Sequence, residues 1–103
     1  MNLDLAKARR EHLRWLVMLT LNNARPTGAY EAMVLSVAQS VYQDATALEL
    51  RRELDYLHER ELIHVDKQPS GMWHTALNRL GVDVVEYTVD CEPGIARPAK
   101  YWP

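Results

Sequence analysis

Residues 46–77 read TALELRRELDYLHERELIHVDKQPSGMWHTAL, and within this run a helical repeat changes into a strand repeat. Leucines recur on one face of a predicted helix over 47–60: Leu50, Leu54 and Leu57. Thr46 and Glu49 have the form of a capping box, in which each side chain satisfies the free backbone N–H of the other residue. The pattern predicts a capped amphipathic helix that leads directly into extended chain.

The extended part has the alternation of a half-buried strand. Ile63 and Val65 alternate with His64 and Asp66. Residues 69–71, Pro-Ser-Gly, supply turn chemistry, since glycine adopts positive φ without steric cost. Residues 72–77 then return as a second strand, so we expect a hairpin.

A helix is predicted over 4–22, with Asp4 as its N-cap. Its main apolar stripe has the three-four spacing of a buried face: Leu13, Leu16, Val17 and Thr20. Trp15 and Met18 lie off that stripe, so the helix is apolar on more than one side. Such a helix usually has a second packing surface, for example on a partner subunit.

Two further helices are expected. Residues 29–42 carry a clean amphipathic pattern: Tyr30, Met33, Val34, Val37 and Val41. A last helix follows Asn78 as its cap, with an apolar face of Leu80, Val84 and Tyr87. Gly81 inside this helix weakens it by roughly 1 kcal/mol relative to alanine, which predicts close packing there. From Asp90 onward the chain holds three of its five prolines and is not expected to be helical.

The bulk composition is that of one soluble domain. The chain has 103 residues, 48% apolar and 25% charged, with a net charge of −2. Its lone cysteine, Cys91, excludes an intrachain disulfide and fits the reducing cytoplasm. No apolar run approaches the roughly 20 residues of a membrane span. No nucleophile, phosphate-binding or metal-ligand motif is found, so we expect neither an enzyme nor a cofactor.

The predicted order is helix, helix, helix, strand, turn, strand, helix. A helix pair with a tight connection followed by a hairpin is the winged form of the helix-turn-helix. We therefore expect a mainly α (α+β) winged-helix domain over 1–90. An extended tail over 91–103 is expected to lie along its own or a partner subunit.

The same residues carry a family resemblance. The leucine run, the hairpin with Gly71 at its tip and Leu77-Asn78-x-x-Gly81 resemble winged-helix regulators of the ArsR and MarR type. Over residues 9–98 the chain is similar to small ArsR-like proteins of Mu-like phages and prophages. Its features there are Arg9-Arg10, Arg51-Arg52-Glu53-Leu54 and Gly94-Ile95-Ala96-Arg97-Pro98. The resemblance implies a transcription regulator that binds DNA.

Three departures from the family pattern are visible. Asn78 replaces the usual threonine and keeps its capping role. Glu61 stands where such proteins commonly end the third helix with glycine, so the helix is expected to run on or to close differently. The cysteine pairs and His–Asp clusters of metal-sensing ArsR proteins have no counterpart here.

Six residues are candidate DNA contacts: Thr46, Arg51, Arg52, Lys67, Gln68 and Ser70. In a winged helix the third helix enters the major groove, where arginine binds guanine or a phosphate, and the wing touches the backbone. The simpler interpretations are that both arginines pair with carboxylates at helical spacing, that Thr46 only caps, and that the wing tip is an ordinary polar turn.

Six apolar residues beyond one core face are candidate homodimer contacts: Trp15, Met18, Tyr87, Ile95, Tyr101 and Trp102. A chain this short gains buried surface by pairing with a copy of itself. The alternative to a DNA-binding dimer is a winged-helix adaptor that binds protein. Residues 44–61 favour it, because they hold six acidic residues against three arginines.

Overall fold

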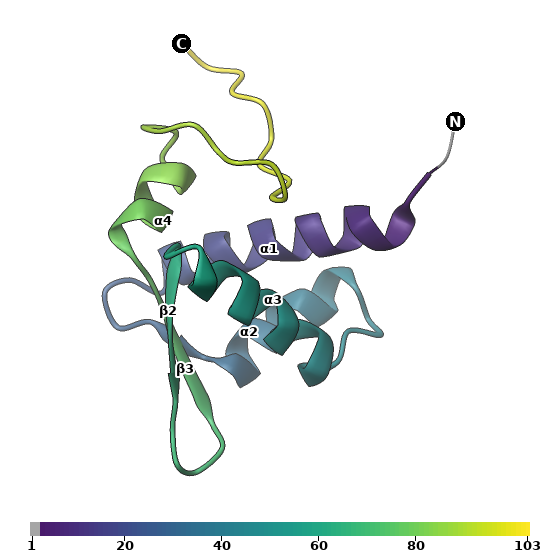
Figure 1. Cartoon of the computed structure of the whole chain (residues 1–103), viewed down its shortest axis with the longest axis vertical. Helices are drawn as coiled ribbons and strands as arrows, with labels where there is room; N and C mark the ends of the chain where they lie inside the picture. Colours follow the sequence, from purple (N-terminus) through teal and green to yellow (C-terminus); the bar gives the residue numbers. More distant parts are fainter. Residues whose placement is uncertain (1–2) are drawn as a thin grey trace.

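Helix α1 begins at its predicted cap. In the computed structural model, which describes residues 3–103, the Asp4 carboxylate accepts a hydrogen bond from the backbone N–H of Lys7 at 2.9 Å. The helix then runs over Leu5–Asn23. Residues 1 and 2 of the predicted domain lie outside the described residues. The described residues form four helices and a three-stranded antiparallel sheet, a mixed α+β fold (Figure 1).

Helices α2, Glu31–Val41, and α3, Ala47–Glu59, lie against α1 and form most of the helical core with it. The α3 leucines are buried, as the repeat predicts. The α2 stripe behaves differently. Of its five apolar residues only Val34 is buried, while Met33, Val37 and Val41 are exposed. The inward side of α2 also carries Ala38, whose small side chain packs with Leu13 and Ala45.

The sheet has one strand that the sequence did not predict. The hairpin β2, Ile63–Lys67, and β3, Trp73–Leu77, forms as expected. Residues Ala29–Tyr30, expected to begin the second helix, instead form β1 on the other edge of β3. The completely buried hydroxyl of Thr75 donates to the Ala29 carbonyl at 2.8 Å. The pairing explains why α2 begins only at Glu31.

The second apolar side of α1 is covered by the chain itself. After α4, Arg79–Val85, the chain turns back and lies beside α1 (Figure 1). Ile95 joins Trp15 and Met18 in one buried cluster, and the backbone N–H of Ala96 donates to the Glu11 carbonyl at 3.1 Å. The tail therefore covers the second apolar side of α1, where a partner subunit was one of the expected contacts.

This packing corrects the candidate dimer contacts. Trp15 and Ile95 are buried and Met18 is 0% exposed within the single chain, so these three side chains present no surface to a partner. Tyr87 is partly buried and meets Trp102 edge to face, with ring centroids 4.7 Å apart. Tyr101 is 91% exposed. Only the two last aromatic residues keep the expected exposure.

The junction between α3 and the sheet has the left-handed backbone conformation that glycine usually adopts at a helix end. Glu61 adopts a left-handed backbone with φ of 62°, so the helix ends despite the departure from the family pattern. Leu62 N then donates to the Leu57 carbonyl at 3.1 Å. A left-handed residue that closes a helix in this way satisfies carbonyls left free at the helix end.

Helix α4 is shorter than predicted and turns a different face inward. Gly81, Val82 and Val84 are buried, whereas Leu80 is 44% exposed and Tyr87 lies beyond the helix. The expected close packing at Gly81 is confirmed, because a Cβ there would lie 2.2 Å from the Leu62 carbonyl. Asn78 occupies the cap position, but its side chain donates to the Glu61 carbonyl and makes no capping bond.

Candidate nucleic-acid interface

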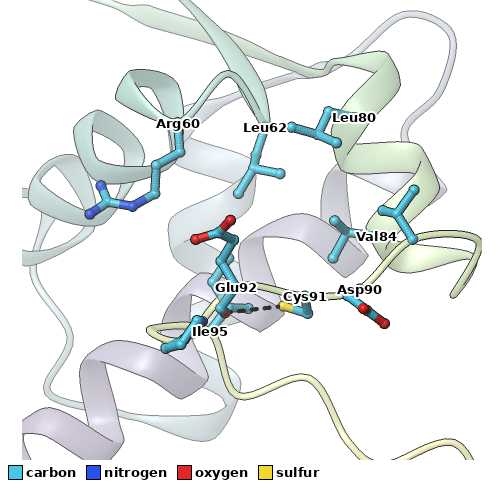
Figure 2. A pocket seen from close by; sticks show the side chains of 10 residues that line it. Arg60, Leu62, Leu80, Val84, Asp90, Cys91, Glu92 and Ile95 are labelled. Carbon is cyan, nitrogen blue, oxygen red and sulfur yellow. Dashed lines mark hydrogen bonds between the residues drawn. The ribbon is translucent and has the colours of Figure 1, made fainter.

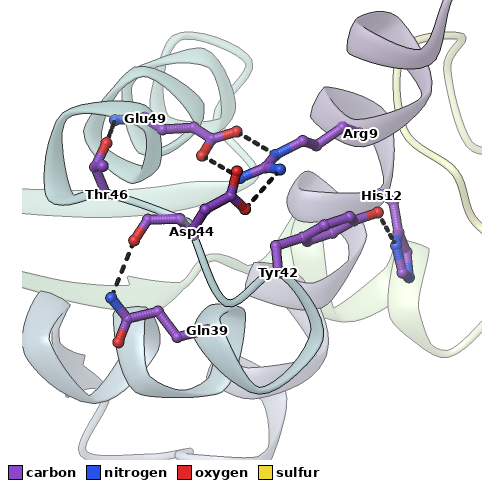
Figure 3. A network of polar contacts seen from close by, with 8 residues as sticks. Arg9, His12, Gln39, Tyr42, Asp44, Thr46 and Glu49 are labelled. Carbon is purple, nitrogen blue, oxygen red and sulfur yellow. Dashed lines mark hydrogen bonds and ion pairs between the residues drawn. The ribbon is translucent and has the colours of Figure 1, made fainter.

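The α2–α3 connection is held by polar contacts at the start of α3. The Thr46 hydroxyl accepts a hydrogen bond from the backbone N–H of Glu49 at 3.2 Å. The Glu49 carboxylate does not return this contact and instead accepts two bonds from Arg9, at 2.7 and 2.8 Å (Figure 3). The predicted capping box is therefore half formed, since only Thr46 acts as a cap.

Arg9 draws the start of α3 toward α1. Its guanidinium contacts Asp44 at 2.9 Å in addition to Glu49, and it lies 4.7 Å from the centre of the Tyr42 ring. Hydrogen bonds to Glu49 and then Asp44 raise the pKa of Arg9 above its usual range. Beside it, His12 Nδ1 and the Tyr42 hydroxyl lie 2.7 Å apart (Figure 3). Arg9 thus has acidic partners within the chain.

Arg51 connects α3 to both α2 and the hairpin. Its guanidinium makes a two-point contact with the Glu31 carboxylate, with Nε and Oε2 2.7 Å apart and a second bond from Nη2 to Oε1. It also donates to the Gly71 carbonyl at 2.8 Å. The hydrogen bond from Arg51 lowers the pKa of Glu31, although burial of the carboxylate opposes this effect. Arg51 therefore positions the hairpin against α3.

Lys67 contributes to the same cluster from β2. Its ammonium lies 3.1 Å from the Asp55 carboxylate of α3 and 4.4 Å from the centre of the Trp73 ring. The Arg51 guanidinium is also 4.4 Å from that ring. Cations over an aromatic face are attracted by its negative potential. The Trp73 ring thus contacts both Arg51 and Lys67, the two cations that were expected to face DNA.

The other hairpin candidates have local partners. Gln68 Nε2 donates to the Tyr30 hydroxyl at 3.3 Å, which connects the hairpin to the end of β1. The Ser70 hydroxyl accepts from the backbone N–H of Met72 at 3.4 Å, as in an ordinary turn. Both residues belong to the turn end of the hairpin and add no charge to it.

Arg52 differs from the other basic candidates. It is exposed near the middle of α3, and within residues 3–103 it makes no ion pair. Leu48 and Glu59 are exposed on the same side of the helix. A free guanidinium on such a face can reach a phosphate or the edge of a base. The neighbouring carboxylates Asp55 and Glu59 leave the face mixed in charge.

Long-range pairing was the feature that the sequence did not reveal. Arg51 pairs with Glu31 twenty positions earlier, and Arg9 pairs with Glu49 forty positions later. Neither separation is a helical repeat, so no local pattern pointed to these partners. Arg14, which pairs with Glu53 of α3, is the exception. A charged residue inside the apolar run 13–19 indicates that its side chain has a buried partner.

Comparisons with protein-family models, with curated proteins and with solved structures find no match to this chain. Within residues 3–103, no helix combines the length and the apolar character that crossing a membrane requires. The same described part of the chain brings together no group of three or more metal-binding side chains. The assignment of a function therefore depends on the geometry of α3 and the hairpin.

Proposed function

We propose that this protein is a winged helix-turn-helix DNA-binding module, with α3 as the recognition helix and the β2–β3 hairpin as the wing. The exposed guanidinium of Arg52 is the observation that carries the proposal. It projects from the helix that such folds place in the major groove. The sheet order β1-β3-β2 and the tight α2–α3 connection agree with this architecture.

The paired cations have a supporting role in this proposal. Arg51 fixes the hairpin through Glu31 and Gly71, and Lys67 joins it to α3 through Asp55. A preorganised wing loses less conformational entropy on binding. The resemblance to ArsR-like prophage proteins extends the proposal to a transcription regulator. The lone cysteine fits a cytoplasmic protein, and so short a chain gains buried surface as a homodimer. Tyr101 and Trp102 are the candidate dimer contacts that stay exposed.

The test is a selection from random duplex DNA with purified protein, followed by anisotropy titrations at several salt concentrations. Arg52→Ala should weaken binding. If Arg52 contacts a phosphate, the magnitude of the salt slope falls by about 1, whereas if it contacts a base, the sequence preference at that position is relaxed. Arg79→Ala is the matched control, because its side chain is exposed on α4 and away from the interface. An absence of binding at about 50 mM salt would reject the proposal.

A protein-binding adaptor is the second candidate, and one specific observation favours it. Glu31 and Asp55 neutralise Arg51 and Lys67, so α3 and the hairpin carry no continuous positive stripe. A photo-crosslinking residue at position 48, exposed on α3, separates the two candidates. Crosslinks to duplex DNA support the first candidate, and crosslinks to a protein in the absence of DNA binding support the second.

A further inference from the structure

The segment that follows α4 closes a cavity of about 370 Å³ against the end of α3 and α4 (Figure 2). Its apolar wall consists of Leu62, Leu80, Val84, Val89, Pro93 and Ile95. The volume is within the range of cavities that hold small organic molecules, which are mostly apolar with a few polar groups. None of the residues in the proposed DNA interface lines this cavity.

The cavity is a fixed part of the fold, because the tail is tied down on both sides of it. Before the tail turns along α1, Arg14 donates to the Gly94 carbonyl at 2.8 Å and Ile95 enters the core. Beyond it, Arg97 donates to the carbonyls of Val84 and Val89, at 3.0 and 2.9 Å. These bonds hold the segment that covers the cavity, residues 89–95, in place without a ligand.

The polar side chains of the cavity carry an excess of negative charge. Asp90 and Glu92 are exposed and, among the described residues, neither forms an ion pair. The opposing cation is Arg60, whose guanidinium is already engaged. It lies 3.5 Å from the centre of the Tyr56 ring and donates to the Tyr56 carbonyl at 3.3 Å. Figure 2 shows the Glu92 carboxylate on the side of Arg60 and Leu62, whereas the Asp90 carboxylate points away past Cys91. A cationic ligand in the cavity therefore meets Glu92, and Asp90 adds negative charge from farther away.

Cys91 also lines the cavity and favours noncovalent binding. Burial raises the pKa of its thiol and Glu92 adds to the effect, while Arg97 opposes it. The thiol donates to the Glu92 carbonyl at 3.6 Å. A protonated thiol is a poor nucleophile. The chemistry of the cavity is that of an apolar wall with acidic groups at its mouth.

We propose that this cavity binds a small apolar organic cation, with the hydrocarbon body against Leu62, Leu80 and Val84 and the ammonium group beside the Glu92 carboxylate. Apolar burial supplies the affinity, and Glu92, with Asp90 farther away, supplies the preference for positive charge. The site is independent of the proposed DNA binding.

Three probes that differ only in the end group test the preference: 4-phenylbutylamine, 4-phenylbutanol and 5-phenylpentanoate. Titrations followed by amide chemical shifts in the full chain should give the order amine, alcohol, carboxylate, with about a two- to fivefold step between the first two. The shifts should centre on residues 89–95 and on α4. Tighter binding of the carboxylate, no binding of the amine, or shifts elsewhere would overturn the proposal.

Two sets of variants locate the site. Leu80→Trp fills the cavity from an exposed position and should abolish binding of the amine, whereas Met33→Trp, at an exposed position on α2, should leave it unchanged. Asp90→Asn combined with Glu92→Gln should reduce binding of the amine to that of the alcohol. Retained binding in Leu80→Trp, or an unchanged preference in the double variant, contradicts the proposal. Amide spectra of each variant verify that it is folded.

Discussion

Arg14 and Glu53 form an ion pair inside the core, with Nε and Oε1 2.8 Å apart and with only 9% and 3% of the two residues exposed. The same guanidinium donates to the Gly94 carbonyl and lies 3.4 Å from the centre of the Tyr56 ring. One side chain of α1 thus joins α3 and the tail. Removal of either partner would leave a buried charge without its counterion.

Glu53→Leu should therefore lower the free energy of unfolding by about 3–5 kcal/mol. The double variant Arg14→Met with Glu53→Leu should lose less than the sum of the single changes, because it leaves no unpaired charge. Urea denaturation measures both. Asp83→Asn is the control, since it removes an exposed pair with Arg79 and should cost about 0.5 kcal/mol or less. Additive losses in the double variant would contradict a coupled pair.

The Glu31–Arg51 pair predicts a pH dependence. Arg51 lowers the pKa of Glu31 in the folded protein below its ordinary value of 4.5, so the pair stabilises the fold above that pH. This contribution is lost as the pH falls through the lowered pKa. In urea denaturation at a series of pH values, the wild type should lose stability below pH 4.5 more steeply than Glu31→Gln. Glu59→Gln, at an exposed position on α3, should follow the wild type.

Glu61 offers a stabilising change. Its φ of 62° places a side chain in the left-handed region, where residues other than glycine are strained. Glu61→Gly should raise the free energy of unfolding by about 1 kcal/mol, since the contacts of its backbone carbonyl are retained. Glu61→Ala keeps the strain and should bring no such gain. A loss of stability in the glycine variant would show that the Glu61 side chain itself supports the junction.

Gly81 should be sensitive to the smallest addition. An added methyl group meets the Leu62 carbonyl at 2.2 Å and a Leu77 side-chain carbon at 2.6 Å, and the backbone atom cannot move aside alone. Gly81→Ala should cost about 1–3 kcal/mol in thermal or urea unfolding despite the higher helix propensity of alanine. An added Cβ at Gly71 has nothing within 4 Å, so Gly71→Ala should cost only the strain of its φ of 90°, about 1 kcal/mol.

Short-range patterns were sufficient for most elements. The cap at Asp4, the leucine face of α3, the change of period at Ile63 and the hairpin all depend on residues close together in the chain, and the structure confirms them. Strand β1 was missed because two residues carry no repeat and form a strand only where β3 supplies partners. The apolar stripe of α2 was regular, but most of it is exposed. The position of α2 against α1 and α3 decided which side of the helix was buried, and the apolar pattern of α2 alone did not.

By itself, the sequence determined where α1, α3 and β2 begin, because caps and apolar periods act over a few residues. The tertiary structure alone decided what the charged side chains do. Arg51 and Lys67 pair with Glu31 and Asp55 because the fold brings separate elements together. Of the two arginines of α3, Arg52 is then the one without an ion pair among residues 3–103. Likewise, the return of the tail to α1 buried residues that had pointed to a partner. Such contacts span twelve to eighty positions, and no local repeat encodes them.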